Sequence, residues 1–426
     1  MSLPILEIPE EIASVCKLYQ PVFSKPQFLH FKQFFLSLLL TGEGDIEALS
    51  EGYSLSQSYD ALHHFVSEGT WDINDVLEQT VEVVKKLPGG QCFHDKGMLI
   101  IDDTLIEKYG KMMEAVGKLW DHSESRYLEY AHCLVGLCWA DAKKLRYPLR
   151  FELYRKEDDV KAGLELAEKG GKETTGLVPF KTKVQIAKEL ITWAVSQRVP
   201  FGTVVFDSWF FCKELVDFIE GLKKDWISMS KSNRNIVNLG KTTTCAEYAK
   251  TFNPEDLPTT KVHETTYAIK SVQMRFPNLE RGKETVRLVV SFQKKSEKEG
   301  GGYYTPVFLV SNRKDIRPER LLRAYQIRWN IETFFKDAKS IGLGKYQMRG
   351  LHGIKSHWCL VFTSAVLLEL IRLEVCTKEG KSLTEMSFGN LKKRAFGKTF
   401  RLIIKQVLAD ARSGIPDEQI YAKLGL

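Results

Sequence analysis

The chain has 426 residues, of which 43% are hydrophobic and 27% are charged. This composition is typical of a globular protein with room for two or three domains, and it excludes a disordered or fibrous chain. The 61 lysines and arginines exceed the 54 acidic residues, so the formal net charge is +7. Such a mild excess is compatible with a polyanionic partner but does not require one.

The cysteines and the apolar segments exclude further classes of protein. None of the eight cysteines forms a CxxC pair or a Cys/His cluster with zinc-site spacing, which indicates a reduced, cytoplasmic chain. Residues 1–17 are acidic where a signal peptide would be basic and then apolar. The apolar run at 34–40 is too short to cross a membrane. We therefore expect no membrane partner.

Residues 1–92 are expected to form an appended helical domain. Apolar residues recur at helical spacing through 30–40 and again through 76–87. Between these segments, 54–72 has a polar start followed by an amphipathic turn that ends at Gly69. This segment fits the second half of a helix-turn-helix, and it fits a plain helical bundle equally well.

From residue 97 the pattern changes to short apolar runs that predict strands. They are 97–102, 131–141, 147–154 and 202–207, the last of them preceded by a helix at about 181–197. Strands joined by a crossover helix indicate a mixed α/β sheet. A second strand-rich block with long polar turns follows at 226–310 and suggests an inserted sheet, and helices return from about Pro318.

Two aspartates end apolar strands. Asp102 closes the run MLIID, and Asp207 closes TVVFD. The carboxyl edge of a sheet is where side chains emerge toward a cleft, so an acid there is placed for chemistry. One such aspartate alone more often caps a turn, and the pair gains meaning only with a third group.

The third group lies on a helix predicted from about 324 onward. Tyr325, Arg328, Glu332 and Lys339 fall within roughly 60° of arc at helical spacing. One polar stripe therefore carries an acid between two cations. Taken alone, it could be a solvated face whose Arg328/Glu332 pair contributes only about 0.2–0.5 kcal/mol.

The spacing of these four residues resembles the Tyr-Arg-Glu-Lys signature of a large group of bacterial insertion-sequence transposases with a ribonuclease-H-like DDE core. The resemblance extends to RWNIETFF around the stripe, IIDDT at the first acid, FDSWF at the second, FLVSN before the helix and YQMRGLHGIKSHW after it. It covers roughly residues 50–375, and the combination is more specific than any single motif.

The resemblance implies a catalytic triad of Asp102, Asp207 and Glu332, a β-rich insertion between the second and third acids, and a helical N-terminal domain that binds transposon ends. In-line attack on a phosphodiester accumulates negative charge, which two Mg²⁺ ions held by carboxylates can stabilise. We expect these three acids to be the metal ligands and Mn²⁺ to substitute for Mg²⁺.

The expected fold class is therefore α/β: a ribonuclease-H-like mixed sheet with flanking helices, a β-rich insertion and an N-terminal helical domain. Five segments follow from this assignment. They are the DNA-binding domain 1–92, the first part of the catalytic core 93–225, the insertion 226–312, the last part of the core 313–375, and a C-terminal helical region 376–426 that could contact DNA or a second subunit.

The first acid has an adjacent alternative, because Asp102 and Asp103 are consecutive in IIDDT. Alternation along a strand points them to opposite sides of the sheet. The family pattern of Asp, any residue, then Ser or Thr favours Asp102 with Thr104, and both assignments stay open.

The stripe also suggests DNA contacts. Arg328 and Lys339 would contact phosphates beside the cut, and Tyr325 could add a phosphate hydrogen bond. Trp329 could support the active site or stack on a displaced base, although a packed aromatic is the simpler interpretation.

A second basic segment, 390–405, interleaves cations with aromatic residues. Its Lys392, Lys393 and Arg394 could bind DNA, and a solvated helix face is an equally good interpretation. Excision through a DNA hairpin would require an aromatic residue that holds a flipped base, for which Trp226 is a candidate.

The function that best fits these patterns is Mg²⁺-dependent cut-and-paste transposition. The protein would act as a homodimer on terminal inverted repeats and target DNA, in the bacterial cytoplasm and at the nucleoid. One alternative is a domesticated, non-transposing DNA-binding protein of the same fold. Another is a stand-alone metal-dependent nuclease, which would not need the N-terminal domain.

Overall fold

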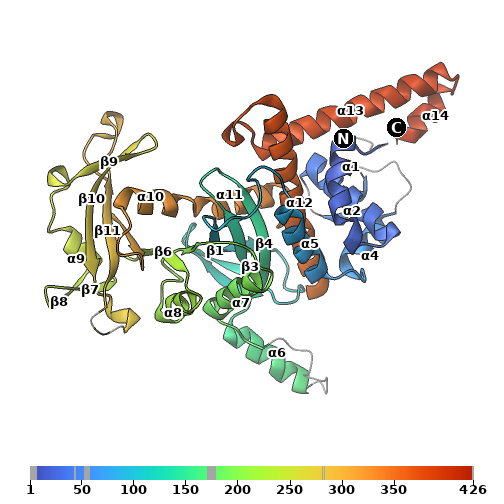
Figure 1. Cartoon of the computed structure of the whole chain (residues 1–426). Helices are drawn as coiled ribbons and strands as arrows, with labels where there is room; N and C mark the ends of the chain where they lie inside the picture. Colours follow the sequence, from blue (N-terminus) through green and yellow to red (C-terminus); the bar gives the residue numbers. More distant parts are fainter. Residues whose placement is uncertain are drawn as a thin grey trace.

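The computed structural model describes residues 7–42, 45–51, 58–169, 179–280, 282 and 284–424. A large mixed sheet runs through the middle of the molecule, with the N-terminal helices on one side and a strand-rich extension on the other (Figure 1). The expected α/β class, a mixed sheet flanked by helices, is confirmed.

The central part of the sheet contains six strands. They are β1 (Met98–Glu107), β2 (Gly117–Asp121), β3 (Arg126–Ala140), β4 (Arg146–Tyr154), β5 (Thr203–Phe206) and β6 (Asp225–Ser230). Strand β3 pairs antiparallel with β1, β2 and β4, whereas β5 pairs parallel with both β1 and β6. The spatial order β4, β3, β1, β5, β6 is the one that a ribonuclease-H-like core requires.

Strands β1 and β5 lie at the centre because their sequences are apolar on both faces. Leu99, Ile100 and Ile101 of β1 are fully buried, as are the last three residues of β5. Such continuous apolar runs are typical of strands covered on both sides by other elements. An aspartate follows each run, although β1 continues beyond Asp102 and buries Ile106 again.

The strand-rich segment after β6 continues the central sheet. It contributes β9 (Thr259–Val262), β10 (Thr265–Met274), β11 (Val286–Gln293) and β12 (Val307–Ser311), paired antiparallel in the order β12, β11, β10, β9. Strand β12 also pairs with β6, so ten strands form one sheet. Within the described ranges, only the hairpin of β7 (Asn235–Asn238) and β8 (Lys241–Thr244) forms a second sheet.

Helices cover the sheet and build the N-terminal part. These are α1 (Glu10–Cys16), η1 (Lys17–Val22), α2 (Lys25–Thr41), α3 (Ile46–Glu51), α4 (Tyr59–Ser67), α5 (Ile73–Lys85), α6 (Glu157–Lys169), α7 (Lys183–Ser196), α8 (Lys213–Gly221) and α9 (Cys245–Ala249). Of the helix-turn-helix candidate 54–72, residues 54–57 lie outside the described residues, and α4 and the start of the turn into α5 make up the rest.

The long helix α12 (Leu351–Glu379) joins the N-terminal helices to the sheet. It is buried along almost its whole length and packs against β4, α4, α5 and α11 (Trp329–Ser340) (Figure 1). It leads into α13 (Phe388–Arg412) and α14 (Asp417–Leu424), and α13 also packs against α2. In the part of the chain that the structure describes, no helix is both long enough and apolar enough to span a bilayer.

Two further sequence-based expectations concern single residue types. All eight cysteines are free thiols. Trp226 is fully buried in β6, where its indole N–H donates to Glu220 at 2.7 Å. The ring packs against Phe206 and Phe211, so the proposal that Trp226 holds a flipped base is wrong for this structure.

Candidate active site

The two aspartates meet at one edge of the sheet because their strands are parallel neighbours. Ile101 of β1 lies opposite Phe206 of β5, so Asp102 and Asp207 follow at the same level. Asp207 follows the last residue of β5, as the sequence predicts, whereas β1 continues to Glu107, so Asp102 lies in the middle of its strand and not at its carboxyl end.

The acidic helix approaches the same edge from one face of the sheet. Residues 318–340 form two helices, α10 (Pro318–Gln326) and α11 (Trp329–Ser340), instead of one continuous helix. The chain turns at Ile327 and Arg328, so an arc calculated for a single helix does not hold here. The close approach of α11 requires Gly136 of β3, since a Cβ there would stand 3.0 Å from the ring of Phe335.

Arg328 links two acids that are far apart in the sequence. Its Nη1 donates to Asp102 Oδ2 at 2.8 Å, and its Nη2 donates to Glu332 Oε1. The guanidinium also lies over the rings of Tyr325 and Trp329, 5.5 and 5.7 Å from their centroids. The guanidinium therefore bridges two carboxylates with one nitrogen on each, and it forms charge-assisted hydrogen bonds to both.

Asp207 is held by the backbone of its own turn. Its Oδ1 accepts the N–H groups of Trp209 at 2.9 Å and Phe210 at 3.3 Å. Within the described part of the chain, the second carboxylate oxygen of Asp207 accepts no hydrogen bond from a protein donor. Ser228 of the adjacent β6 donates to the Asp207 carbonyl at 3.0 Å and fixes the turn against the sheet.

The electrostatics of this edge favour a cation. The pKa of Asp102 is raised to about 7 by burial, with Arg328 lowering it and the charges of Asp207 and Asp103 raising it further. Burial also raises the pKa of Asp207, which its two backbone hydrogen bonds lower in part. Converging acids whose charged forms are penalised are stabilised by any cation placed between them.

Asp103 points elsewhere, as strand alternation predicts. Its Oδ2 pairs with Lys183 Nζ at 2.9 Å and accepts the Cys133 thiol at 3.4 Å. Lys183 also lies over the exposed ring of Trp209, 4.9 Å from its centroid. Asp102 therefore faces the Arg328 cluster, whereas Asp103 forms a separate ion pair with α7.

The carboxylates of Asp102, Asp207 and Glu332 are suitable ligands for a hard divalent metal, but their present arrangement does not form a metal site. Carboxylate oxygens are the ligands that Mg²⁺ prefers. Across the described ranges, however, no three His, Cys, Asp or Glu side chains are grouped closely enough to hold a metal ion as they stand. Arg328 occupies the position between Asp102 and Glu332. These residues therefore fit a divalent ion only if the guanidinium turns away from at least one acid.

The other stripe residues differ in exposure. Trp329 is 58% exposed beside the cluster, whereas Tyr325 is buried under the Arg328 guanidinium. Lys339 lies at the far end of α11, about 10 Å along the helix from Glu332. Burial lowers its pKa, while the charges of Asp121 and Glu124 raise it.

The second basic segment lies away from this edge of the sheet. Lys392, Lys393 and Arg394 belong to α13, which packs against α2, α12 and α14. Arg394 pairs with Glu379 at 2.6 Å. The structure therefore does not bring these three cations together with the acid cluster.

Two residues near the acids carried no prediction from sequence. Lys183 begins α7 and meets Asp103 across a long chain separation, so no local pattern reveals it. Trp209 is 42% exposed directly after Asp207, and a large aromatic residue in a polar turn was the available signal.

Family models match most of the chain. A model described as "DDE superfamily endonuclease" matches residues 20–261, and one described as "Transposase DDE domain" matches 181–367. The first match includes Asp102, the second includes Glu332, and both include Asp207. No curated protein matches the chain. Since the first match alone covers more than half of the sequence, the chain belongs to the DDE superfamily of endonucleases and transposases and is a nucleic-acid-cleaving enzyme.

Proposed function

We propose that this enzyme is a DNA transposase that cuts at transposon ends and joins them to target DNA, with Asp102, Asp207 and Glu332 as its catalytic acids. The observation that carries the proposal is the convergence of these acids at one sheet edge, two of them on a single guanidinium. Family membership supports the cleavage of nucleic acid.

The three acids would hold two Mg²⁺ ions, or Mn²⁺ in their place, once Arg328 turns away. Bound divalent ions activate the attacking oxygen and stabilise the leaving one in phosphodiester cleavage. The freed guanidinium of Arg328 could then pair with a phosphate oxygen beside the cut. The guanidinium lies over the Tyr325 ring, and it could keep this contact while it changes its partner.

DNA would be contacted on both sides of this edge. We assign phosphate contacts to Tyr325, Arg328 and Lys339, and base stacking to the exposed ring of Trp329. Lys392, Lys393 and Arg394 on α13 would bind DNA or face a second subunit at a distance from the cut. Base contacts, which give specificity for transposon ends, would come from the helical domain 1–92.

The remaining segments keep their proposed roles. Residues 93–225 and 313–375 would form the catalytic core, 226–312 the insertion, and 376–426 a region that contacts DNA or the second subunit of a homodimer. Strand β6 at 225–230 pairs with β5 in the central sheet, so residues 226–230 belong with the core and the insertion would begin after them.

The test is cleavage of DNA that carries both ends of the encoding element, with Mg²⁺, resolved on a denaturing gel. Asp102→Asn, Asp207→Asn and Glu332→Gln should each abolish cleavage and retain end binding, because each removes charge but little volume. Asp103→Asn is the matched control and should keep activity. Robust cleavage by Asp207→Asn would reject the assignment, and cutting without strand joining would favour a stand-alone nuclease.

A further inference from the structure

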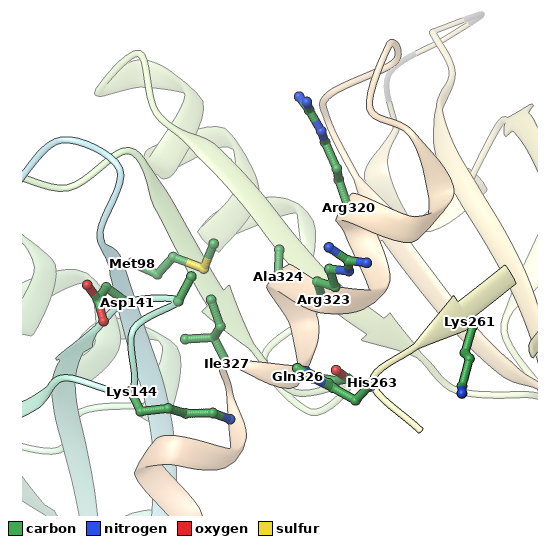
Figure 2. A pocket seen from close by; sticks show the side chains of 11 residues that line it. Met98, Asp141, Lys144, Lys261, His263, Arg320, Arg323, Ala324, Gln326 and Ile327 are labelled. Carbon is green, nitrogen blue, oxygen red and sulfur yellow. The ribbon is translucent and has the colours of Figure 1, made fainter. Parts of the chain in front are cut away.

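A cavity of about 640 Å³ lies where the central sheet meets its strand-rich extension (Figure 2). The start of β1, the turn between β3 and β4, the helix α10 and the turn between β9 and β10 contribute its walls. Segments from three separate parts of the chain therefore enclose one space.

The cavity has an apolar floor and a cationic rim. Met98, Ala324 and Ile327 form the apolar part. Four cations and a histidine surround it: Lys144, Lys261, Arg320, Arg323 and His263. Since only one acid lines the same space, the rim carries a clear positive excess.

That acid, Asp141, is already committed to its own turn. Its Oδ1 accepts the backbone N–H groups of Lys143 at 2.9 Å and Leu145 at 3.0 Å, and its Oδ2 lies 3.3 Å from His94 Nε2. Its carboxylate therefore fixes the turn that carries Lys144, and its single charge offsets only part of the positive charge of the rim.

Most rim cations have no acidic partner. Lys261 pairs at 3.2 Å with the exposed Glu264, an interaction that contributes little in water. Over the described residues, no ion pair involves Lys144, Arg320 or Arg323. Side chains that cluster in this way without partners repel each other, and an anionic ligand removes that repulsion.

The backbone under these cations is fixed. Helix α10 buries Leu321, Leu322 and Tyr325 against the sheet, which leaves Arg320 and Arg323 on its opposite side. The carbonyl of Lys144 accepts Arg372 Nη2 at 2.9 Å, which holds the second wall. The cations are thus presented from rigid elements, which lowers the entropic cost of binding.

The cavity is also close to the acids. Met98 and Asp102 lie two pleats apart on β1 and so point to the same face of the sheet, about 13 Å from each other. Ile327 in the floor directly precedes Arg328. Successive phosphates of a DNA strand are separated by rotation about the duplex axis as well as by the rise of about 3.4 Å, so this distance corresponds to roughly two nucleotides along a strand.

We propose that the cavity binds the sugar–phosphate backbone of the DNA substrate roughly two nucleotides from the scissile phosphate, with Lys144, Arg320 and Arg323 as the phosphate ligands. This rests on the proposed function only for the location of the cut. Sugar edges would cover the apolar floor, and the contacts would position the strand without reading its sequence.

The experiment compares two double variants of the full chain with the same change in net charge. Lys144→Gln/Arg320→Gln alters the rim, whereas Lys143→Gln/Arg317→Gln alters exposed cations on the same turn and at the start of the same helix. Duplex binding is measured by fluorescence anisotropy over a salt series without divalent metal. The slope of log K against log salt should fall by roughly two for the rim variant and by clearly less for its control.

Neutral methylphosphonates then locate the contact. When they are placed at successive positions along the duplex, they should weaken the wild-type complex most at roughly two nucleotides from the end to be cut. In the rim variant the same substitutions should have almost no further effect, because a contact can be lost only once. Equal slopes for the two double variants, or an unchanged methylphosphonate profile, would overturn the proposal.

A small anion is the other possible source of phosphate, and pyrophosphate serves as its probe. Loss of pyrophosphate binding in the rim variant with an unchanged DNA slope would assign the cavity to a free anion and reject the DNA contact. Because binding is measured without metal or cleavage, an inactive chain can still confirm the cavity. Conversely, if the protein cleaves DNA but the salt slope of the rim variant is unchanged, only the proposed DNA contact at the cavity is rejected.

Discussion

Two charge clusters of opposite composition lie at the two ends of helix α11. In the first, the cation Arg328 lies between the acids Asp102 and Glu332. In the second, the acid Glu369 of α12 lies between two arginines: Arg372 donates to it, and Arg146 Nε approaches it at 3.8 Å. The second cluster is enclosed, with the Glu369 side chain 1% exposed, whereas the Glu332 side chain is 32% exposed.

This difference in exposure indicates a structural role for the enclosed cluster and exchangeable contacts in the open one. Arg146 of β4 also pairs with Asp337 of α11 at 2.5 Å, so the enclosed cluster ties two helices to the sheet. Its groups cannot reach another partner without unfolding. The open cluster borders solvent, so a metal ion or a phosphate can replace one of its contacts. The enclosed cluster thereby holds the helix that presents Glu332.

The largest expected effect breaks the enclosed cluster. Glu369→Gln removes the acidic partner of buried Arg372 and leaves buried Arg146 with Asp337 alone, which should lower the free energy of unfolding by about 3–5 kcal/mol. Urea denaturation followed by tryptophan fluorescence measures it. The control is Glu374→Gln on the same helix, whose surface pair with Lys378 should contribute less than about 0.5 kcal/mol. Equal losses in the two variants would contradict the enclosed role.

The second prediction concerns the free-energy cost of protonating His357, which is buried on α12. Burial lowers the pKa of His357 to about 4, with its hydrogen bond to the Gly342 carbonyl raising it and the Lys108 charge lowering it further. Between pH 6.5 and 4 the unfolded chain binds the extra proton, so stability falls as the pH falls through this range. The loss due to His357 should be about 3 kcal/mol.

Unfolding free energies of wild type and His357→Gln, measured at pH 7 and pH 4.5, check this prediction. The variant should lose most of that pH dependence, and burial-lowered His132 should account for part of what remains. His352→Gln, an exposed position one turn earlier on α12, should retain the full pH dependence. If His357→Gln lost as much stability between pH 7 and pH 4.5 as the wild type does, protonation of His357 would not be the cause of the loss.

Local sequence patterns predicted the parts of this molecule that depend on local apolar runs. The runs before Asp102 and Asp207 predicted two buried strands, and parallel pairing brings their ends together. The α/β class and the β-rich segment followed from the same periodicity. The catalytic roles of the three acids stay predictions, since geometry alone does not test them.

Features that depend on contacts between distant segments were not predictable. Neither proline nor glycine marks the break between α10 and α11. The break lies at Arg328, whose side chain contacts Asp102 on a distant strand. The pairing of β5 with β6 joins two regions that the sequence suggests as separate sheets. The partner of Asp103 likewise comes from α7, far along the chain.

A third prediction concerns exchange in the open cluster. Arg328→Gln removes the cation between Asp102 and Glu332, so a divalent ion should bind there more readily. At about thirty times its dissociation constant, Mg²⁺ or Mn²⁺ should stabilise this variant by about 2 kcal/mol, and the wild type by less. Thermal unfolding with and without metal measures the shift. Adding Asp207→Asn to Arg328→Gln should abolish the stabilisation by metal, whereas adding Asp103→Asn should not. If Asp103→Asn abolished it and Asp207→Asn did not, Asp103 and not Asp207 would be the metal ligand.

The smallest expected effect compares the same substitution in both clusters. Arg328→Lys and Arg146→Lys each keep the charge but replace a planar fork by a point charge that reaches one acid instead of two. In the open cluster water can replace the lost contact, so Arg328→Lys should cost only about 1 kcal/mol of stability while lowering end-complex formation. Arg146→Lys should cost more, because no water reaches Glu369, and added Mg²⁺ should not restore it. Denaturation of both variants with and without Mg²⁺ tests this contrast. Equal losses and no recovery in either variant would mean that Arg328 has the same structural role as Arg146.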